Sequence, residues 1–465
     1  MAQNFAALLD ATARRHAERP AVRWSGGALS YRAFDRRAGG VARFLGDKGV
    51  AAGDRVALAL PNGWPFAAAF LGALKLGAVV APLDPRLTAE ERAAVLDDLR
   101  PRIVVAEPIA DETERPAVNE AAAAALILYT SGSTGRPKGA VLSHAALAFA
   151  VRSWRDDVMA LTPDDVVLGV LPFSHSFGLN GALLAPLLAG ASVVPVDRFT
   201  PETVLAEIVS HGVTVLPAVA TMFRRLLGSP GLDAASLGTV RMALSGAAPC
   251  PWPLACEWRE RTGIRIFRGY GSTELFRPIS YLAVDAVDRP DAIGRPVPGV
   301  EVRTVDDAGH AVPAGDLGEL LIRTPAAMDG YLGAPEETGE VLIDGWFHTG
   351  DLARLTPDGW VRIEGRKRER ILRGGYSVFP QEVEAILLAH PAVAEAAVVG
   401  VPDDELGEEV TAFVSLHRGR QAEADELIAH CKRQLAAFKY PRRVTIVPEL
   451  PKAATGKVLK KLLTS

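Results

Sequence analysis

The sequence has few cysteines, and this scarcity excludes a disulfide-stabilised protein. Its 465 residues include only three cysteines, at Cys250, Cys256 and Cys431. An odd and sparse set does not form the disulfide framework of a small secreted domain. None of the three is spaced with a histidine in the way that metal ligands usually are. We therefore expect three buried thiols in a reducing compartment.

The sequence also lacks an excess of charge of one sign. There are 51 Lys and Arg residues against 55 Asp and Glu residues, which gives a formal net charge of −4. The basic residues are dispersed, whereas a nucleic-acid-binding chain concentrates them on one surface. We expect no nucleic-acid partner.

Long uninterrupted apolar runs are missing as well. The longest apolar stretches, residues 67–83 and 181–196, are broken by Lys75, by glycines or by Pro186. They are too short to cross a bilayer, so we read them as buried helices and strands and expect no transmembrane segment. The first 20 residues mix charged and apolar side chains, unlike a signal peptide, and we expect a cytoplasmic protein.

The length and the pattern of the chain predict a multidomain α/β protein. A chain of this length exceeds what one hydrophobic core usually supports. Helix-like residues 31–48 are followed by strand-like residues 55–60, and this alternation continues toward residue 270. It predicts α/β layers around a largely parallel sheet. Beyond residue 277, strands separated by Gly and Pro turns predict a small β-rich subdomain.

The composition changes again at residue 365, where the charged run GRKRERILRGG begins. We interpret this run as a hinge between domains, although a charged run is usually a solvated surface. Predicted helices at 380–389 and 424–438 and predicted strands at 394–399 and 410–416 follow it. Together they form an α+β unit of about domain size.

A glycine-rich stretch at residues 129–139, YTSGSTGRPKG, is typical of a loop that surrounds an anion. It holds three glycines, four Ser or Thr hydroxyls, an Arg and a Lys. It is not a P-loop, because Lys138 follows Pro137 and precedes Gly139. The expected anion is a polyphosphate. A flexible linker is the alternative, but apolar residues flank the stretch on both sides.

Other polar, glycine-rich clusters follow strand-like segments. The clusters LPFSHSFG, SGAA and RGYGSTE come at or after predicted strands at 166–171, 240–244 and 264–267. Ligands of open α/β sheets bind beyond the carboxyl ends of the strands. We therefore expect one site assembled from segments that are distant in sequence.

Taken together, these motifs resemble those of the adenylate-forming superfamily of acyl-CoA and aryl-CoA synthetases, adenylation domains and luciferases. The resemblance covers nearly the whole chain, and its motifs occur in order: YTSGSTGRPKG at 129, LPFSHSFG at 171, GYGSTE at 269, GEL at 318, HTGDL at 348, GRKRER at 365, GGYSVFPQEVE at 374 and PKAATGK at 451. It implies a large N-terminal domain, residues 1–366, of layered α/β subdomains with a small β-rich subdomain. A smaller mobile α+β domain, residues 367–465, would follow a hinge near Arg368, where the superfamily commonly has Asp or Lys.

The resemblance implies an ATP- and Mg²⁺-dependent acid:CoA ligase. Such an enzyme joins a carboxylic acid to AMP with release of pyrophosphate, and then transfers the acyl group to the thiol of coenzyme A. The alternative acceptor is the pantetheine of an acyl or peptidyl carrier protein, because the thiol is the same.

The motif positions imply which residues bind the nucleotide and CoA. Those assigned to the phosphates are Thr130, Ser131, Ser133, Thr134 and Lys138. Also assigned to cofactor binding are Ser245, Gly246, Ala247, Gly269, Tyr270 and Gly271, and the adenine would stack on the ring of Tyr270. Asp351 and Arg366 would bind the ribose, and Gly374 and Gly375 would leave room for the pantetheine arm. Taken alone, Tyr270 could be a core residue and Asp351 a turn residue.

The resemblance also implies the residues of the chemical step. Two anions about 4 Å apart repel by several kcal/mol once water is excluded, so cations are needed where carboxylate meets phosphate. Lys457 matches the lysine that stabilises this charge, Thr273 the α-phosphate contact, and Glu274 the Mg²⁺ ligand. The alternative for Glu274 is an acid at a helix N-terminus. His175 matches a position that gates the acyl pocket, with simple packing as its alternative.

The acyl pocket is expected to be mostly apolar. Its implied residues are His175, Thr221, Phe223, Ser245, Gly271 and Leu275, within segments 218–223, 245–248 and 271–278. LPFSHSFGLN contains no Asp to pair with an ammonium group, so an α-amino acid is not expected. We favour a medium or long-chain fatty acid, with benzoate-like acids second. Arg277 either meets a second carboxylate or forms a surface pair, and we favour the surface.

We predict that Lys457→Ala slows acid-dependent pyrophosphate release by about 10²–10³-fold, because it removes the cation from the developing charge. Thioester formation from preformed acyl-AMP serves as the internal control, because the lysine is expected to act in adenylation. Wild-type pyrophosphate release by the variant would refute the assigned role.

Overall fold

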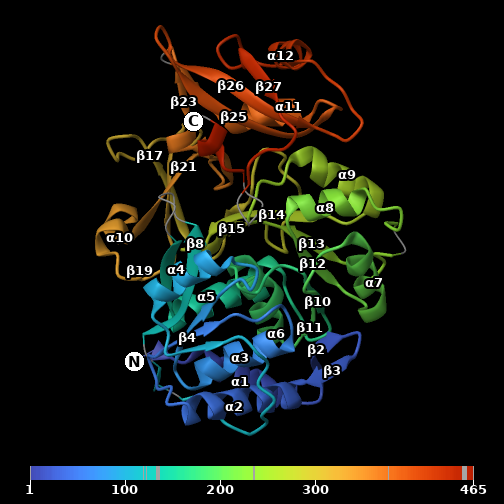
Figure 1. The fold of residues 1–465 in the computed structure, drawn as a ribbon, viewed down its shortest axis with the longest axis vertical. Coiled ribbons are helices and arrows are strands. Elements are labelled where there is room, and N and C mark those ends of the chain that lie inside the picture. Colours follow the sequence, from blue (N-terminus) through green and yellow to red (C-terminus); the bar gives the residue numbers. More distant parts are fainter. Residues whose placement is uncertain are drawn as a thin grey trace. The chain divides into compact units, whose positions relative to one another are not determined.

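The computed structural model describes residues 2–118, 120–121, 123–131, 137–233, 236–374, 376–452 and 458–463. The chain divides into two compact units, which Figure 1 shows in the colours of the sequence. Unit 1 comprises Met1–Val302 and Ile322–Phe347, and unit 2 comprises Arg303–Leu321 and His348–Ser465.

Unit 1 contains a six-stranded sheet with the order β19-β9-β8-β5-β4-β6. The β6-β4, β4-β5 and β5-β8 pairs are parallel, whereas β8-β9 and β9-β19 are antiparallel. Its strands are β4 (Arg55–Leu58), β5 (Val79–Pro82), β6 (Ile103–Val105), β8 (Ala124–Ser131), β9 (Pro137–Ser143) and β19 (Gly330–Tyr331). A two-stranded pair, β1 (Ala2–Gln3) with β7 (Glu120–Ala121), lies apart from it in the hydrogen-bonding pattern.

The second sheet of unit 1 has nine strands in the order β16-β15-β14-β13-β12-β10-β11-β2-β3. The strands from β14 through β11 to β2 are parallel. Strands β10, β12 and β13 are buried along their whole length, which explains their continuous apolar sequences. The bounds are β2 (Pro20–Trp24), β3 (Gly27–Ser30), β10 (Val166–Gly169), β11 (Ser192–Pro195), β12 (Val215–Ala218), β13 (Met242–Ser245), β14 (Ile266–Ser272), β15 (Phe276–Ser280) and β16 (Arg295–Pro296).

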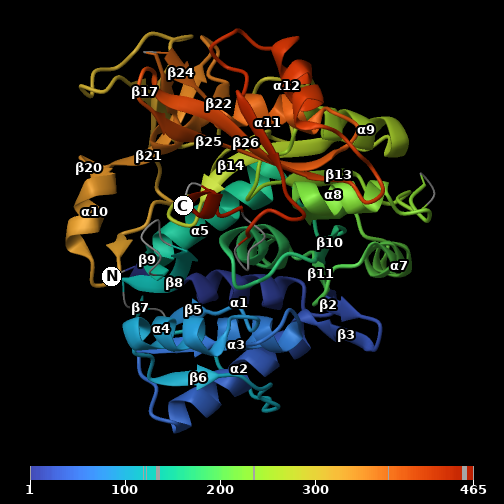
Figure 2. The same cartoon turned by 45° about the horizontal axis from the view of Figure 1, so that its top comes forward.

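Helices enclose these sheets, and local sequence explains where they begin. The side chains of Asn4, Ser30 and Thr88 cap α1, α2 and α4 by accepting backbone N–H groups. Helices α1, α2 and α3 pack on one another, as Figures 1 and 2 both show. The helical bounds in unit 1 are α1 (Phe5–Arg15), α2 (Tyr31–Asp47), α3 (Trp64–Lys75), α4 (Ala89–Leu99), α5 (His144–Ser153), η1 (Trp154–Val158), η2 (Gly178–Leu184), α6 (Ala185–Ala189), α7 (Pro201–His211), α8 (Ala220–Leu227), α9 (Trp252–Thr262) and α10 (Pro335–Val341).

Unit 2 contains the sheet β24-β23-β26-β25, in which β27 pairs in parallel with β26. Helices α11 and α12 pack against this sheet, and the side chains between them form an apolar core. Another sheet, β17-β18-β21-β20 with β22 on β21, contains the positions at which the chain passes between the units. The bounds are β17 (Glu301–Val305), β18 (Gly318–Arg323), β20 (Leu342–Ile343), β21 (Trp346–Leu355), β22 (Val361–Arg366), η3 (Lys367–Glu369), β23 (Ile371–Arg373), β24 (Tyr376–Val378), α11 (Pro380–Leu388), β25 (Val393–Asp403), β26 (Gly407–Leu416), α12 (Ala424–Lys432), β27 (Arg443–Ile446) and η4 (Lys460–Leu463).

The predicted mixed α/β fold is confirmed, and several predicted elements are found nearly in place. Helix α2 matches residues 31–48, and the strands β10, β13 and β26 match the predicted ones within a few residues. The helix predicted at 424–438 is too long, because α12 ends at Lys432 and a turn follows. Cys431 is buried, but Cys250 and Cys256 are only half-buried, which corrects the expectation of three buried thiols. The predicted domain boundary at 366 and the hinge at Arg368, in η3, stay predictions.

Helices are short throughout the described ranges. None of them has both the length and the apolar character that a membrane-spanning helix requires.

A buried ion cluster fixes α3 within unit 1. The ammonium of Lys75, at the end of α3, lies 2.8 Å from Asp10 Oδ1 and 2.8 Å from Asp35 Oδ1. It also donates to the carbonyl oxygen of Arg115 at 2.9 Å. The Lys75 side chain is fully buried. Burial raises the pKa of Asp35, and the charge of Lys75 partly offsets this effect.

We predict that Lys75→Met destabilises the protein by about 3–5 kcal/mol, because it leaves the buried Asp10 and the half-buried Asp35 carboxylates without their cation. Urea and thermal unfolding curves should both show a lower midpoint for the first transition. Lys48→Met, which removes an exposed lysine just after α2, is the matched control and should leave the midpoint unchanged. Equal midpoints for Lys75→Met and the wild type would contradict the prediction.

Candidate active site

Three predicted site segments leave adjacent parallel strands at the same edge of the nine-stranded sheet. Ser245 ends β13 and pairs with Ala218 at the end of β12. On its other side Ser245 pairs with Arg268 in β14. Because these strands run in one direction, the segments that follow them emerge together. The structure therefore brings residues 219–223, 246–247 and 269–271 to one edge.

The glycines of these segments are required by close packing. A Cβ atom on Gly271 would lie 1.8 Å from the carbonyl oxygen of Phe276, and one on Gly269 would lie 2.1 Å from Arg277 Nε. The half-buried Tyr270 stands between these two glycines. The cluster predicted to follow a strand is itself part of one, because β14 continues to Ser272 and turns back as β15. In the neighbouring loop, Ala247 has a positive φ of 64°.

The turn between β14 and β15 presents Thr273 and Glu274, both half-buried. The carboxylate of Glu274 accepts a hydrogen bond from the Tyr331 hydroxyl at 2.9 Å, through Oε1. The carbonyl oxygen of Glu274 accepts the backbone N–H of Met328 at 2.8 Å. Both the backbone and the side chain of Glu274 are thus held by the segment that contains β19.

Lys138 lies next to Tyr331, the tyrosine that donates to Glu274. Tyr331 in β19 pairs with Ala140 of β9, and Lys138 lies two residues before Ala140 on the same strand. The ammonium of Lys138 is 5.3 Å from the centroid of the Tyr331 ring and 3.5 Å from Glu337 Oε1. We call Lys138, Glu274 and Tyr331 the Glu274 cluster. It joins a cation and a carboxylate through a tyrosine, and it connects elements of both large sheets of unit 1.

The tyrosine of this cluster remains a hydrogen-bond donor. Burial raises the pKa of Tyr331 well above its usual value, and the charge and hydrogen bond of Glu274 raise it further. Sequence reasoning had missed Tyr331. The available signal was its position in GYLG, where a tyrosine follows Gly330 and Gly333 comes two residues later.

The acidic residues fit a magnesium ion that is held mainly by its substrate. Among the described residues, no three His, Cys, Asp or Glu side chains gather in a way that could hold a metal ion. Mg²⁺ is usually bound by one or two carboxylates together with substrate phosphates. The Glu274 carboxylate, fixed by Tyr331 at one oxygen, fits such a site.

The two predicted ribose residues meet in unit 2. Asp351 and Arg366 are paired across β21 and β22, and Arg366 Nε lies 2.7 Å from Asp351 Oδ1. The carboxylate is buried, whereas the guanidinium is more than a third exposed. Glu319, from the GEL motif, contacts Lys367 at 3.1 Å and accepts the backbone N–H of Gly350 at 3.3 Å.

His175 has an acidic neighbour that the sequence did not reveal. Its Nε2 lies 3.6 Å from Oδ2 of Asp84, just beyond the end of β5. Arg86 donates two hydrogen bonds to the same carboxylate, at 2.9 and 2.7 Å. Burial opposes ionisation of Asp84, but the hydrogen bonds from Arg86 and His175 outweigh it and hold the pKa of Asp84 well below its usual value. His175 is therefore positioned by an ionised carboxylate as well as by packing.

The predicted acyl-pocket residues differ in exposure. Thr221 is exposed on α8, whereas Phe223 is fully buried in the core and packs edge-on against Trp258 at 4.9 Å between centroids. Leu275 and Ser245 are each only 1% exposed. Their roles in binding an acid stay predictions.

Arg277 is not at the surface, which corrects the expectation of a surface pair. Its relative exposure is 6%, in the buried strand β15. Its Nε and Nη2 atoms donate to Ser280 Oγ and to the carbonyl oxygen of Phe267, each at 3.1 Å.

Several predicted site residues lie outside the described residues. These are Ser133, Thr134, Gly375 and Lys457, together with the side chain of Ser131. Of their neighbours, Thr130 pairs with Lys138 across the β8-β9 hairpin, and Gly374 has a left-handed φ of 55°. The predicted hinge residue Arg368 is exposed.

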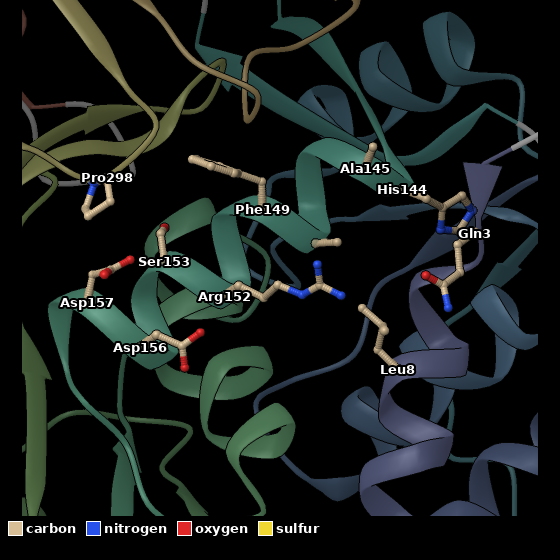
Figure 3. Close-up of a pocket in the computed structure, with 11 residues that line it drawn as sticks. Gln3, Leu8, His144, Ala145, Phe149, Arg152, Ser153, Asp156, Asp157 and Pro298 are labelled. Carbon is tan, nitrogen blue, oxygen red and sulfur yellow. The ribbon is translucent and has the colours of Figure 1, made fainter.

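A cavity of about 360 Å³ lies elsewhere in unit 1, along α5 (Figure 3). The side chains of His144, Phe149 and Arg152 line it together with Leu8 from α1. None of the predicted site residues lines this cavity, so it is not the predicted active site.

Two curated proteins illustrate the chain's similarity to enzymes. A feruloyl-CoA synthase of Amycolatopsis sp is 34% identical over 96% of this chain and 96% of its own length. A fatty acid–[acyl-carrier-protein] ligase, ScoC of Streptomyces coeruleorubidus, is 34% identical over 96% of this chain and 92% of its own length.

A solved structure and two family profiles extend the similarity to the fold. ATP-bound MatB from Rhodopseudomonas palustris superposes with a TM-score of 0.93 at 33% identity, over 100% of this chain and 98% of that one. The profile of the AMP-binding enzyme family matches residues 9–123 and 106–332, and that of the AMP-binding enzyme C-terminal domain matches residues 382–457. The chain therefore belongs to the AMP-binding enzymes, the adenylate-forming superfamily of acyl-CoA synthetases.

Proposed function

We propose that this AMP-forming acid–thiol ligase activates a carboxylic acid with an apolar body and transfers it to coenzyme A. In the first half-reaction, a carboxylate oxygen attacks the α-phosphorus of ATP, and the bond to the β-phosphate breaks with release of pyrophosphate. In the second, the thiolate of CoA attacks the acyl carbon and AMP leaves. Family membership supports the reaction type, and the Glu274 cluster is the observation that supports its location.

The Glu274 cluster suits the phosphate end of ATP. Lys138 supplies a positive charge at the end of the glycine-rich stretch, and Glu274 supplies the carboxylate that would hold Mg²⁺. When bound, this ion neutralises phosphate charge. Tyr331 donates to Glu274 and so restricts the orientation of the carboxylate. The proposed phosphate contacts are Thr130, Ser131, Ser133, Thr134 and Lys138, with Thr273 at the α-phosphate.

The residues that bind the adenine and ribose of ATP are assigned from the positions of the motifs. Tyr270 lies between Gly269 and Gly271, which pack against Arg277 and Phe276 of β15, and we assign its ring to stacking on the base. We assign the base to the edge formed by Ser245, Gly246, Ala247, Gly269, Tyr270 and Gly271. The paired Asp351 and Arg366 offer a carboxylate acceptor and guanidinium donors for the ribose hydroxyls.

Lys457 is proposed as the cation between the two reacting anions. The domain of residues 367–465 would deliver it by moving about Arg368, and would then rotate to admit the thiol past Gly374 and Gly375. Such closure both excludes water and strengthens the lysine's electrostatic effect.

The acid is proposed to be a medium or long-chain fatty acid or an aromatic acid. Small and apolar groups at Gly271 and Leu275 suit either body. His175, held by Asp84, is the proposed gate of this pocket. One relative is named for a feruloyl product and another for fatty acids and an acyl carrier protein, so a carrier protein is the second candidate acceptor. We place the enzyme in the cytoplasm.

Incubation with ATP, Mg²⁺, CoA and a panel of acids should give AMP, pyrophosphate and an acyl-CoA in equal amounts. Pyrophosphate release must depend on the acid, which makes an acid-free reaction the control. Replacing CoA by a pantetheinylated carrier protein distinguishes the two acceptors. Formation of AMP without a CoA thioester from every acid would contradict the proposal of CoA as the acceptor.

Tyr331→Phe should raise the Mg²⁺ concentration needed for half-maximal activity by about 10–100-fold, because residues that orient a metal ligand contribute that much to affinity. Titration of Mg²⁺ at saturating ATP measures the effect. Tyr31→Phe is the control, because it removes a buried hydroxyl that donates to Leu187 and Ala191 carbonyl oxygens at 3.0 and 2.7 Å. It should lower stability without changing the Mg²⁺ requirement. An unchanged Mg²⁺ requirement in Tyr331→Phe would exclude the orienting role.

A further inference from the structure

Arg277 is a buried cation without a carboxylate partner. Its Nε and Nη2 atoms donate to a hydroxyl and to a carbonyl oxygen, whereas the buried Nη1 atom has no hydrogen-bond partner among the residues that the structure describes. Among the described residues, no Asp or Glu side chain lies within ion-pair distance of it. The protein thus leaves part of this guanidinium unsatisfied.

Two aromatic rings surround the guanidinium but do not neutralise it. Its central carbon lies 5.0 Å from the ring centroid of Trp154 and 5.7 Å from that of Phe177. The two rings are themselves 5.4 Å apart. Cation–π contacts recover part of the cost of burial. They fix the position of the guanidinium and exclude water, which leaves a directed donor in an apolar setting.

Burial without a counter-ion also affects the ionisation of the Arg277 guanidinium. Burial lowers the pKa of Arg277 to about 9, and no acidic neighbour in the described ranges offsets this effect. Burying a charge without a counter-ion is costly, and buried charges in proteins are normally paired. An anion that entered here would therefore gain a strong, charge-assisted interaction.

A second buried arginine shows how the same strand region satisfies a purely structural guanidinium. Arg268 in β14 is also 6% exposed and also lies over two rings, those of Trp252 and Tyr281. Its terminal nitrogens both donate, to the carbonyl oxygens of Pro290 and Arg289 and to the Tyr281 hydroxyl. Arg277 differs in having a terminal nitrogen that donates to nothing.

The unpartnered nitrogen lies beside Gly246, which belongs to segment 245–248 of the predicted acyl pocket and also to the edge assigned to the base. A Cβ atom placed on Gly246 would lie 3.1 Å from Arg277 Nη1 and 3.0 Å from the Phe177 ring. A Cβ on Gly269 would overlap Arg277 Nε. The guanidinium therefore packs against the backbone of the loop that follows β13 and of strand β14. Any side chain at Gly246 would cover the Nη1 atom.

We propose that Arg277 Nη1 binds a second carboxylate at the far end of the acyl substrate, so that the preferred acid is a dicarboxylic acid with an apolar body. The proposal rests on the ligase function proposed above. It changes the substrate class from a fatty acid or simple aromatic acid to an acid with two anionic ends. One end reacts with ATP and the other meets the arginine.

The test compares pairs of acids in which a methyl group replaces one carboxylate. Adipate is paired with hexanoate, succinate with butyrate, and terephthalate with 4-methylbenzoate. For the wild type, kcat/KM should favour the diacid of at least one pair by about tenfold or more, because a site built to bind a polar group rejects the analogue that lacks it. Most of the difference should lie in KM.

Arg277→Met should reverse that preference, and Arg277→Lys should keep part of it. Arg268→Met is the matched control: it removes a buried arginine from the neighbouring strand and should lower thermal stability without changing the ratio of the two kcat/KM values. The KM for ATP should stay unchanged in Arg277→Met, which separates an effect on the acid from one on the nucleotide.

The outcomes separate this inference from the ligase function. If the wild type activates monocarboxylic acids and prefers no diacid in any pair, the inference is overturned while the ligase function stands. An equal diacid preference in Arg277→Met and the wild type overturns it as well. If no acid gives AMP, the ligase function itself fails. Should Arg277→Met not fold, the wild-type ratios and Arg277→Lys still decide.

Discussion

The parallel pairing of β10 through β14 is the constraint on which the candidate site depends. Parallel strands end at the same edge of a sheet, so every loop that follows them starts from one line. Residues 219–223, 246–247 and 269–271 are brought together for this reason alone. The antiparallel strand β15 excludes side chains at Gly269 and Gly271, where a Cβ would overlap Arg277 or Phe276. The sheet therefore places the segments and also dictates part of their composition.

Three charged groups of unit 1 differ in how far neighbouring side chains neutralise them. Lys75 is fully buried and has two carboxylates within 2.8 Å, so its charge is satisfied without a ligand. In the Glu274 cluster, the hydroxyl of Tyr331 donates to Glu274 and its ring faces Lys138, whose ammonium also lies 3.5 Å from the carboxylate of Glu337. Within the described part of the chain, the contacts of Arg277 are with aromatic rings and neutral polar groups. We therefore assign Lys75 a structural role, and the Glu274 cluster and Arg277 roles in the proposed ligand binding.

The comparison of Arg268 with Arg277 gives the physical basis for reading a buried cation as functional. Both are equally buried and both contact two rings, so burial and aromatic packing do not distinguish them. The two arginines differ in the hydrogen bonds of their terminal nitrogens: both nitrogens of Arg268 donate, whereas Nη1 of Arg277 has no acceptor among the described residues. A buried donor without an acceptor is costly, and selection for a ligand that supplies the acceptor is one reason for such a donor to persist.

Sequence by itself determined the fold class, the family and the order of the motifs, because these depend on local patterns: alternation of apolar residues, glycines at strand ends and runs of fixed residues. Helix α2 and strand β10 were predictable because their apolar periodicity is local. Only the tertiary structure decided that Tyr331 donates to Glu274, that Asp84 faces His175, and that Arg277 is buried. Each of these depends on contacts between residues far apart in the chain. The sequence around a single charged or aromatic residue does not show whether its side chain lies in solvent or in the core.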